Sequence, residues 1–118
     1  MKTYEIPVLF KEGDIVYDPQ NKHYKRCIIR FDEKDGMYHC DGSTFPITDQ
    51  FKYKKVSSID DLFIGDTVRV PFDPNCYQIV QFINNTKVIL HQIHGDNYNI
   101  IVPLNNLLDI NGYSFNII

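Results

Sequence analysis

The sequence predicts an all-β protein composed of two small five-stranded barrels in tandem. Its 118 residues include 16 Ile, 8 Val, 8 Phe and 8 Tyr but only 6 Leu, 3 Glu and no Ala. β-branched and aromatic side chains favour strands, whereas the depleted residues are strong helix formers. An internal repeat and short apolar runs separated by turn residues point the same way. Together these features exclude a helix bundle, and the hydrophobic fraction of 43% excludes a disordered chain.

An internal repeat divides the chain near its middle. Residues 13–16 (Gly-Asp-Ile-Val) return as residues 65–68 (Gly-Asp-Thr-Val), at an offset of 52. Three further segments match in the same order: 28–31 with 79–82 at an offset of 51, 37–39 with 88–90 at the same offset, and 45–47 with 102–104 at an offset of 57. The rise from 51 to 57 places six extra residues in the second copy, around residues 94–99. The repeat predicts two domains, residues 1–55 and 56–118.

The first copy is expected to run through five short strands. Cys27, Ile29 and Phe31 alternate with other residues along the second strand, which directs these three side chains inward and places Phe31 in the core. Glycine, aspartate and proline interrupt the apolar runs and mark turns at residues 13–14, 32–36, 42 and 46–47.

A single helical turn over residues 57–62 is expected to link the copies, because its serines can cap a helix and its acids complement the N-terminal dipole. The second copy then repeats the strand order. Val80 and Phe82 are expected to face inward, with Phe82 as the counterpart of Phe31. Its turns are expected at residues 65–66, 84–85, 95–96 and 103–107.

The two Gly-Asp-x-Val segments resemble the opening strand of the SH3-like barrel superfold, which includes Tudor and KOW domains. The strands that run into a single turn at residues 46–47 and 103–107 resemble the closing strand of that fold. The glycine-rich KOW motif does not follow the first strand, where residues 17–20 and 69–72 stand instead. The resemblance spans nearly the whole chain and implies a binding module, without identifying its ligand.

Six aromatic residues are candidate ligand contacts. The resemblance to Tudor-like barrels implies an aromatic cage for a methylated lysine or arginine at one end of each barrel, since aromatic faces attract cations. The candidates are Tyr17, Tyr24 and Tyr38 in the first copy, and Phe72, Tyr77 and Tyr98 in the second. The alternative is that these rings cover the sheet and keep their hydroxyls in water, as tyrosines on small barrels do.

Basic residues are concentrated in the first copy. Residues 1–55 contain 10 Lys/Arg and 9 Asp/Glu, whereas residues 56–118 contain 2 and 6, so the copies carry +1 and −4 and sum to the net charge of −3. Two basic runs, residues 22–26 and 51–55, contain interleaved aromatic residues, which suits phosphate attraction with base stacking. The candidate nucleic-acid contacts are Lys22, Lys25, Arg26, Lys52, Lys54 and Lys55. The alternative is a solvated loop and a charged edge strand that deters aggregation.

No catalytic or metal-binding motif is present. His91, His94, His39 and Cys40 have the ligand types that zinc prefers, but residues three apart on a strand point to opposite faces. We therefore expect no metal and no cofactor. The sequence contains no phosphate-loop motif and no nucleophile-elbow motif, so we expect the protein not to be an enzyme. Residues 13–17 also resemble an early strand of MazF-type toxin ribonucleases, although residues 25–29 lack the proline of the strand that follows; a small nuclease is therefore a third hypothesis.

The chain is expected to be cytoplasmic and to contact no membrane. Residues 1–10 lack the apolar core of a signal peptide, and no run approaches the roughly 20 apolar residues that span a bilayer. Cys27, Cys40 and Cys76 are expected to be free thiols packed among apolar residues, because their number is odd and they lack CxxC spacing.

These observations favour a non-enzymatic adaptor that binds a protein or peptide partner through a groove or a barrel mouth. The alternative is a nucleic-acid-binding barrel pair in which the basic first copy is the reader. The salt dependence of binding separates the two, since phosphate contacts give a steep slope. The identity of the partner and the oligomeric state stay open.

Overall fold

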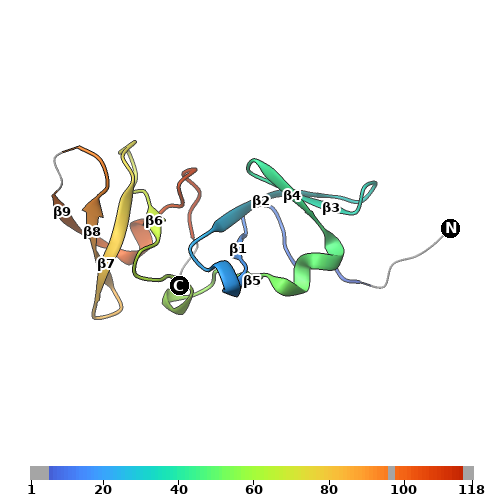
Figure 1. Ribbon diagram of the computed structural model, residues 1–118, viewed down its shortest axis with the longest axis horizontal. Coiled ribbons are helices and arrows are strands. Elements are labelled where there is room, and N and C mark those ends of the chain that lie inside the picture. The colour runs from blue at the N-terminus through green and yellow to red at the C-terminus, as the bar shows by residue number, and fades with distance from the viewer. Residues whose placement is uncertain (1–5, 96–97, 116–118) are drawn as a thin grey trace.

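The computed structural model describes residues 6–95 and 98–115. Figure 1 shows two curled antiparallel sheets, one towards each end of the molecule, with short 3₁₀ turns between strands. The first sheet has five strands in the order β4-β3-β2-β1-β5, and the second has four in the order β6-β7-β8-β9. The prediction of an all-β fold is confirmed. Among the described residues, no helix has the length and apolar content needed to cross a membrane.

The first half contains a complete five-stranded sheet. Its elements are β1 (Ile15–Tyr17), η1 (Pro19–Asn21), β2 (Lys25–Asp32), β3 (Met37–Cys40), β4 (Ser43–Pro46), η2 (Ile47–Lys52) and β5 (Lys54–Lys55). Strand β1 lies between β2 and β5, so that Tyr17 pairs with Lys25 on one side and with Lys54 on the other. The two basic runs of the sequence therefore flank the same short strand.

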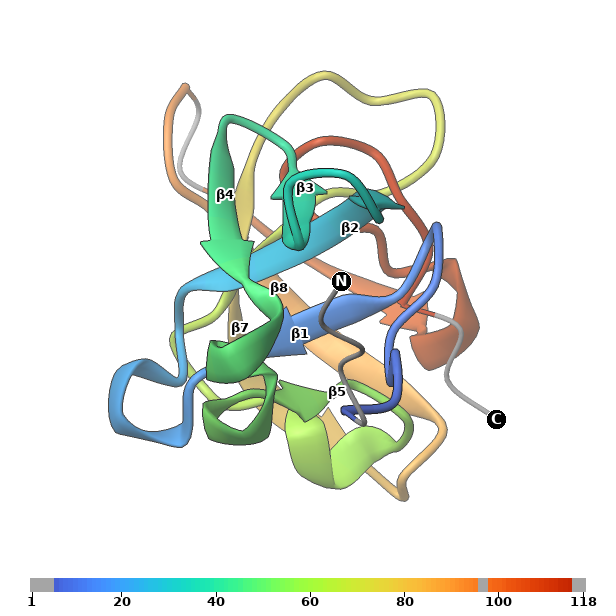
Figure 2. The ribbon, with the colours of Figure 1, turned by 90° about the vertical axis from the view of Figure 1, so that its right-hand side faces the viewer.

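The second half repeats most of this order. Its elements are η3 (Ile59–Asp61), β6 (Thr67–Val68), β7 (Tyr77–Ile83), β8 (Lys87–Gln92), β9 (Asn99–Pro103) and η4 (Leu104–Asn106). Ser58 caps η3 as its sequence predicts, because its side chain accepts from the Asp60 N–H while Asp61 completes the capping box. Figure 2 looks along the long axis from the first half and shows β1 and β2 in front of β7 and β8.

The expected fifth strand of the second half is reduced to one residue among those described. Leu108 forms an isolated bridge with Arg69, which matches the pairing of Lys54 with Tyr17 in the first half. The chain turns immediately afterwards, because the Asp109 carboxylate accepts hydrogen bonds from the backbone N–H groups two and four residues later. The inserted segment expected around residues 94–99 lies partly outside the described residues, at 96 and 97.

The core continues across the predicted boundary. Val16 packs in a cluster confined to the first half, together with Ile28 and Tyr38. Ile15 and Tyr17, its neighbours on β1, belong to a larger cluster whose other members come mostly from the second half. Because successive side chains of a strand point to opposite faces, β1 is buried on both sides. The two halves therefore share a packed interior.

A β-bulge changes the inward face of the longest strand in each half. The pairing of β2 with β3 shifts between Ile28 and Arg30, and that of β7 with β8 shifts between Ile79 and Gln81. An extra residue on one strand reverses the alternation beyond it. The predicted inward positions at Ile29 and Val80 are therefore wrong. Ile28 and Ile79 are the buried residues, Ile29 is half-buried and Val80 is exposed.

The third strands of the two halves correspond at a different offset from the one expected. Phe31 pairs with Tyr38, and Phe82 pairs with Val88, so Tyr38 and Val88 occupy the same place at an offset of 50. The second hairpin turn is one residue shorter, which the sequence match at 51 did not detect. Phe31 and Phe82 do correspond, and each is half-buried and packed against its cluster.

The two Gly-Asp turns have the same geometry. Gly13 and Gly65 both adopt positive φ, +90° and +99°, which a residue with a Cβ rarely adopts. Each donates its N–H to the backbone carbonyl of the buried isoleucine of the long strand at 2.8 Å. The following aspartates, Asp14 and Asp66, each accept a hydrogen bond at 2.9 Å from the backbone N–H three residues earlier. The matching sequence thus encodes matching local structure.

Candidate functional site

Three of the six candidate aromatic contacts are buried. The Tyr17 hydroxyl donates to Asp61 Oδ1 at 2.7 Å, the Tyr77 hydroxyl donates to Asp73 Oδ2 at 2.6 Å, and the Tyr38 hydroxyl donates to the Gln50 side chain. Burial, together with the adjacent Asp61 carboxylate, raises the pKa of Tyr17 to about 12. Each ring fills the interior and each hydroxyl is used within the fold.

The other three candidates lie at the surface in separate places. Tyr24 precedes β2, Phe72 follows β6 in a turn with positive φ, and Tyr98 precedes β9. Tyr98 lies beside Tyr77, with their hydroxyl oxygens 3.3 Å apart. The hydrogen bond to Asp73, supported by Tyr98, raises the pKa of Tyr77. The structure thus brings Tyr77 and Tyr98 together but does not collect three candidate rings into one cage in either half.

Three of the six candidate basic residues are paired with carboxylates. Lys25 binds Asp66 at 2.6 Å and Lys54 binds Asp61 at 2.9 Å, both across the two halves, whereas Lys55 lies 3.6 Å from Asp14. Burial lowers the pKa of Lys25, although its contact with Asp66 opposes that shift. These lysines are held by the fold.

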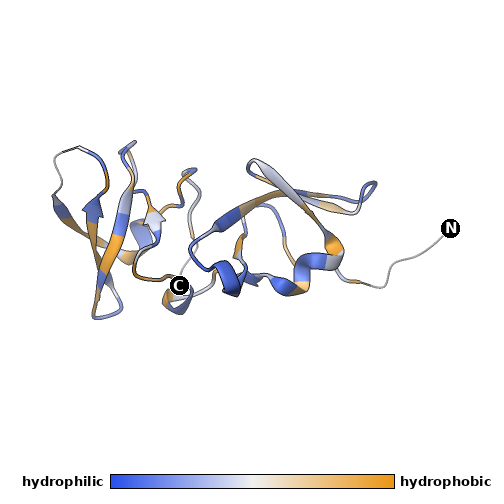
Figure 3. Ribbon diagram, in the orientation of Figure 1, coloured by the Kyte–Doolittle hydropathy of each residue, from blue (hydrophilic) through white to orange (hydrophobic). Residues whose placement is uncertain are grey.

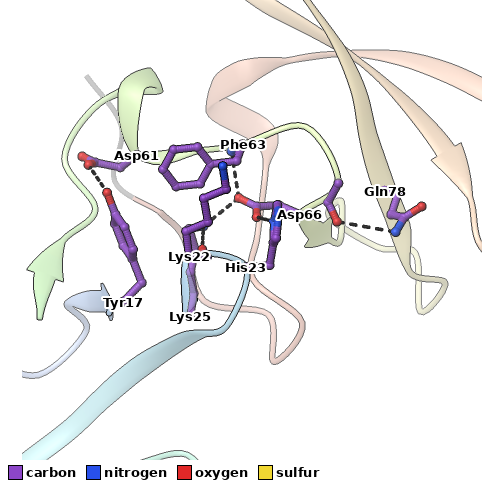
Figure 4. A network of polar contacts seen from close by, with 9 residues as sticks. Tyr17, Lys22, His23, Lys25, Asp61, Phe63, Asp66 and Gln78 are labelled. Carbon is purple, nitrogen blue, oxygen red and sulfur yellow. Dashed lines mark hydrogen bonds and ion pairs between the residues drawn. The ribbon is translucent and has the colours of Figure 1, made fainter. Parts of the chain in front are cut away.

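Two aspartates of the second half organise this junction (Figure 4). Asp66 lies with Oδ1 2.6 Å from His23 Nδ1, while its Oδ2 accepts from Lys25. Asp61 accepts from Tyr17 and pairs with Lys54. Burial alone would raise the pKa of Asp61, but hydrogen bonds from the Ser57 and Ser58 backbone, Lys54 and Tyr17 outweigh it and lower the pKa to about 2.

A phenyl ring completes the junction between these carboxylates. Lys22 Nζ and Lys25 Nζ each lie 4.9 Å from the centre of the Phe63 ring, and Tyr17 meets that ring edge to face. Such cation–π contacts contribute roughly 0.5–2 kcal/mol each, depending on desolvation. Three of the six candidate basic residues, Lys22, Lys25 and Lys54, therefore contact the second half.

Arg26 is different, because its guanidinium is held by aromatic rings and not by an acid. It lies 5.1 Å from the centre of Tyr24, 5.5 Å from Tyr53 and 6.0 Å from Phe45. The Tyr53 and Phe45 rings pack against each other with centres 4.4 Å apart. Lys52 Nζ lies 5.9 Å from the Tyr53 ring. We call Tyr24, Arg26, Phe45, Lys52 and Tyr53 the Arg26 cluster.

The Arg26 guanidinium has unused hydrogen-bonding capacity. Its Nε is buried without a hydrogen-bond partner, and no ion pair of Arg26 occurs among the described residues. An arginine carries five N–H donors in a planar fork that matches a carboxylate or a phosphate. Figure 3 shows that η1 and the start of β2, where Arg26 lies, form a continuous hydrophilic stretch. The chemistry of the Arg26 cluster therefore suits an anion.

The sequence pattern indicated only part of this cluster. Tyr24, Arg26 and Lys52 were candidates, under two different hypotheses, whereas Phe45 and Tyr53 were missed. The signal for Tyr53 was its place between lysines in the second basic run. The signal was incomplete, because only the strand order β2-β1-β5 brings that run alongside Arg26.

The candidate zinc ligands are not assembled. His91 Nδ1 lies 2.7 Å from Asn99 Oδ1, His94 is exposed, and His39 belongs to the other sheet. Within the described residues, one group has metal-ligand geometry: Asp32, Asp35 and His39, whose ligand atoms lie within 4.8 Å of one another. The two carboxylates already accept backbone hydrogen bonds within the hairpin turn, as aspartates in turns commonly do.

The arrangement is suited to binding. A cation framed by aromatic faces offers hydrogen bonds and stacking, and the adjoining ion pairs fix the strands that carry it. Comparisons of the chain with protein-family models, with curated proteins and with solved structures find no match.

Proposed function

We propose that the chain is a non-enzymatic module that binds a protein or peptide partner, with two SH3-like barrels at residues 1–55 and 56–118. In this proposal, the Arg26 cluster is the principal contact and receives an acidic side chain of the partner. The observation that carries it is the Arg26 guanidinium, framed by aromatic rings and without a carboxylate partner among the described residues.

The barrel assignment is supported by the details that the two halves share. Both contain a Gly-Asp turn with positive φ, a bulge at the corresponding place in the long strand, and a closing strand that runs into a 3₁₀ turn at a Pro-Ile or Pro-Leu step. A duplication of one small barrel explains why these features recur in the same order. Each half is too small to be more than marginally stable alone, and the shared core offsets that weakness.

The chemistry of the Arg26 cluster supports a protein partner. Arginine and tyrosine are enriched at the residues that dominate protein interfaces, because both supply large contact areas with directional polar groups. Tyr24 is 49% exposed, so a partner can cover its ring while it approaches the guanidinium. Two parallel hydrogen bonds from arginine to a carboxylate are stronger than a neutral pair. An Asp or Glu flanked by an apolar residue fits this surface.

A nucleic-acid partner is the second candidate, and one observation favours it. Lys22, Arg26 and Lys52 each contact an aromatic ring while remaining free of carboxylates within the described part of the chain. Such an arrangement combines phosphate attraction with a stacking platform. The net charge of −4 on residues 56–118 opposes it, because a nucleic acid that crossed both halves would be repelled.

Fluorescence anisotropy with three labelled probes tests the proposal: a Glu-containing peptide, the same peptide with Gln in place of Glu, and an oligothymidine strand. The test variant is Arg26→Gln. The matched control is Arg30→Gln, which removes the same group from the same strand at a side chain that is 60% exposed. Circular dichroism melts of both variants establish that folding is unchanged.

The proposal predicts that the Glu peptide binds at least about tenfold more tightly than the Gln peptide, and that R26Q but not R30Q removes this difference. Absence of Glu-peptide binding up to roughly 1 mM, or equal loss in both variants, would overturn it. Tighter binding of the oligothymidine with a steep salt dependence that R26Q flattens would establish the nucleic-acid candidate instead.

A further inference from the structure

A concave site lies between the two halves, next to the Arg26 cluster. It is a cavity of about 200 Å³ lined by His23, Tyr24, Lys25, Asp66, Thr67, Asp109, Ile110 and Phe115. Tyr24 belongs both to this cavity and to the Arg26 cluster. A pocket for a drug-sized ligand has a volume of roughly 300–1,000 Å³, so this cavity suits one side chain or a comparably small group.

Asp109 is the unusual residue of this cavity. It is only 3% exposed, and its Oδ2 is buried without a hydrogen-bond partner in the described part of the chain. Its Oδ1 accepts hydrogen bonds from the backbone N–H groups of Asn111 and Tyr113 at 3.0 and 2.8 Å. Burial raises the pKa of this carboxyl even though those two hydrogen bonds oppose the shift. A buried carboxylate oxygen is costly unless a donor or a cation meets it.

The remaining charges of the cavity are already matched. Asp66 accepts from Lys25 and from the Phe63 backbone and lies 2.6 Å from His23. The Lys25 ammonium donates to Asp66 and to the Lys22 carbonyl. Asp109 therefore supplies the unmatched charge of the cavity wall, and the group that it lacks is positive or a strong donor.

We propose that this cavity binds the ammonium group of a lysine side chain presented by the partner, with Asp109 Oδ2 as the acceptor. Among the described residues only Oδ2 of this carboxylate lacks a hydrogen-bond partner, which suits a compact ammonium, whereas the guanidinium fork pairs best with two acceptor atoms. Ile110 and Phe115 provide an apolar wall for the methylene stem.

This inference rests on the proposed function in one respect, namely that the lysine belongs to a peptide partner. Because the Arg26 cluster and the cavity meet at Tyr24, the partner would carry an acidic residue and a lysine a short distance apart. The ammonium site itself is independent of Arg26 and is testable with small amines.

The experiment is an NMR titration of the ¹⁵N-labelled protein with n-butylammonium and, separately, with n-butanol as the neutral control. A second arm uses a capped Gly-Lys-Gly peptide and its norleucine analogue, which lacks the ammonium. The variants are Asp109→Asn, which keeps the Oδ1 acceptor, and Ile110→Trp, which fills the cavity from its rim. Asp73→Asn removes an acid from the second half outside this cavity and is the charge control.

The proposal predicts that butylammonium and the lysine peptide shift the amides of residues 66–67 and 109–113, whereas butanol and the norleucine peptide do not. Both D109N and I110W should weaken binding at least about tenfold, and D73N should leave it unchanged. If butylammonium binds but the lysine peptide does not, the proposal that the ammonium belongs to a peptide lysine is overturned. Equal shifts by butanol, or binding that survives D109N and I110W, would overturn the site. Under this inference R26Q still binds amines. The acidic-peptide site at the Arg26 cluster and the ammonium site at Asp109 can therefore fail independently.

Discussion

Lys25 and Asp66 form an ion pair of 2.6 Å that joins the two halves of the fold, with side chains only 6% and 2% exposed. Asp66 corresponds to Asp14 in the first half, and each carboxylate accepts a backbone hydrogen bond within its own Gly-Asp turn. Only Asp66 also receives a buried lysine from the other half. Asp14 pairs with a lysine of its own half, whereas Asp66 pairs with a lysine of the other half.

Replacing Asp66 by Asn should destabilise the protein strongly, because it leaves the Lys25 ammonium buried without its counter-charge. Breaking a buried pair in this way costs about 3–5 kcal/mol. The comparison is Lys55→Met, which removes the half-exposed partner of Asp14 and should cost less than about 1 kcal/mol. Urea denaturation of both variants measures the difference, and equal midpoints would contradict the role given to Lys25 and Asp66.

The stability of the protein should fall in acid as Asp61 is protonated. The folded pKa of Asp61, about 2, lies below the ordinary value of 3.8, so its stabilisation is complete above pH 3.8 and is lost as pH falls from 3.8 towards 2. Asp61→Asn should remove about 2 kcal/mol at neutral pH and flatten the pH dependence in that window. Asp60→Asn alters the exposed neighbouring acid and should do neither; similar profiles for both variants would be inconsistent with this role.

Alanine at the two equivalent glycines should separate backbone strain from packing. At Gly13 the space that a Cβ would enter is open, so Gly13→Ala adds only the strain of positive φ, about 1–2 kcal/mol. At Gly65 a Cβ would lie 3.4 Å from His23 Cε1. Gly65→Ala should therefore cost at least as much as Gly13→Ala, and the His23 ring resonances should shift in that variant alone. Thermal melts and NMR spectra check both expectations.

Chelation should leave the protein unchanged. The group formed by Asp32, Asp35 and His39 is partly exposed, and its carboxylates are occupied by hydrogen bonds of the hairpin turn. Purified protein should contain far less than one equivalent of zinc, and EDTA should not lower the melting temperature. Stoichiometric metal whose removal lowers the melting temperature would refute this expectation.

Turns and caps, which depend on neighbouring residues, were predictable from the sequence. Features that depend on strand pairing or tertiary contacts were not. The Gly-Asp turns at residues 13 and 65 and the capped turn at Ser58 were predictable, because each depends on a few neighbouring residues. The bulges after Ile28 and Ile79 were not, since alternation continues through them in the sequence while the strand pairing shifts.

The candidate site followed the same division. Arg26 was a candidate through its basic run and Tyr24 through the resemblance to Tudor-like barrels, but Phe45 joins them through tertiary packing. Tyr17 carries no sequence signal for burial on β1, because its ring is covered by Phe63 of the other half. Asp109 lies in a stretch with no recognisable motif, and it became a candidate because one of its oxygens has no hydrogen-bond partner among the described residues.

Burial of β1 on both faces links the unfolding of the two sheets. A partly unfolded form that kept only the first sheet would expose Ile15, Tyr17 and Cys27 to water, and one that kept only the second would lose the same contacts. Such half-folded states are therefore costly, so calorimetry should show one transition for the whole chain. A protease cut near residues 55–58 would then leave two fragments that remain associated, as in fragment complementation.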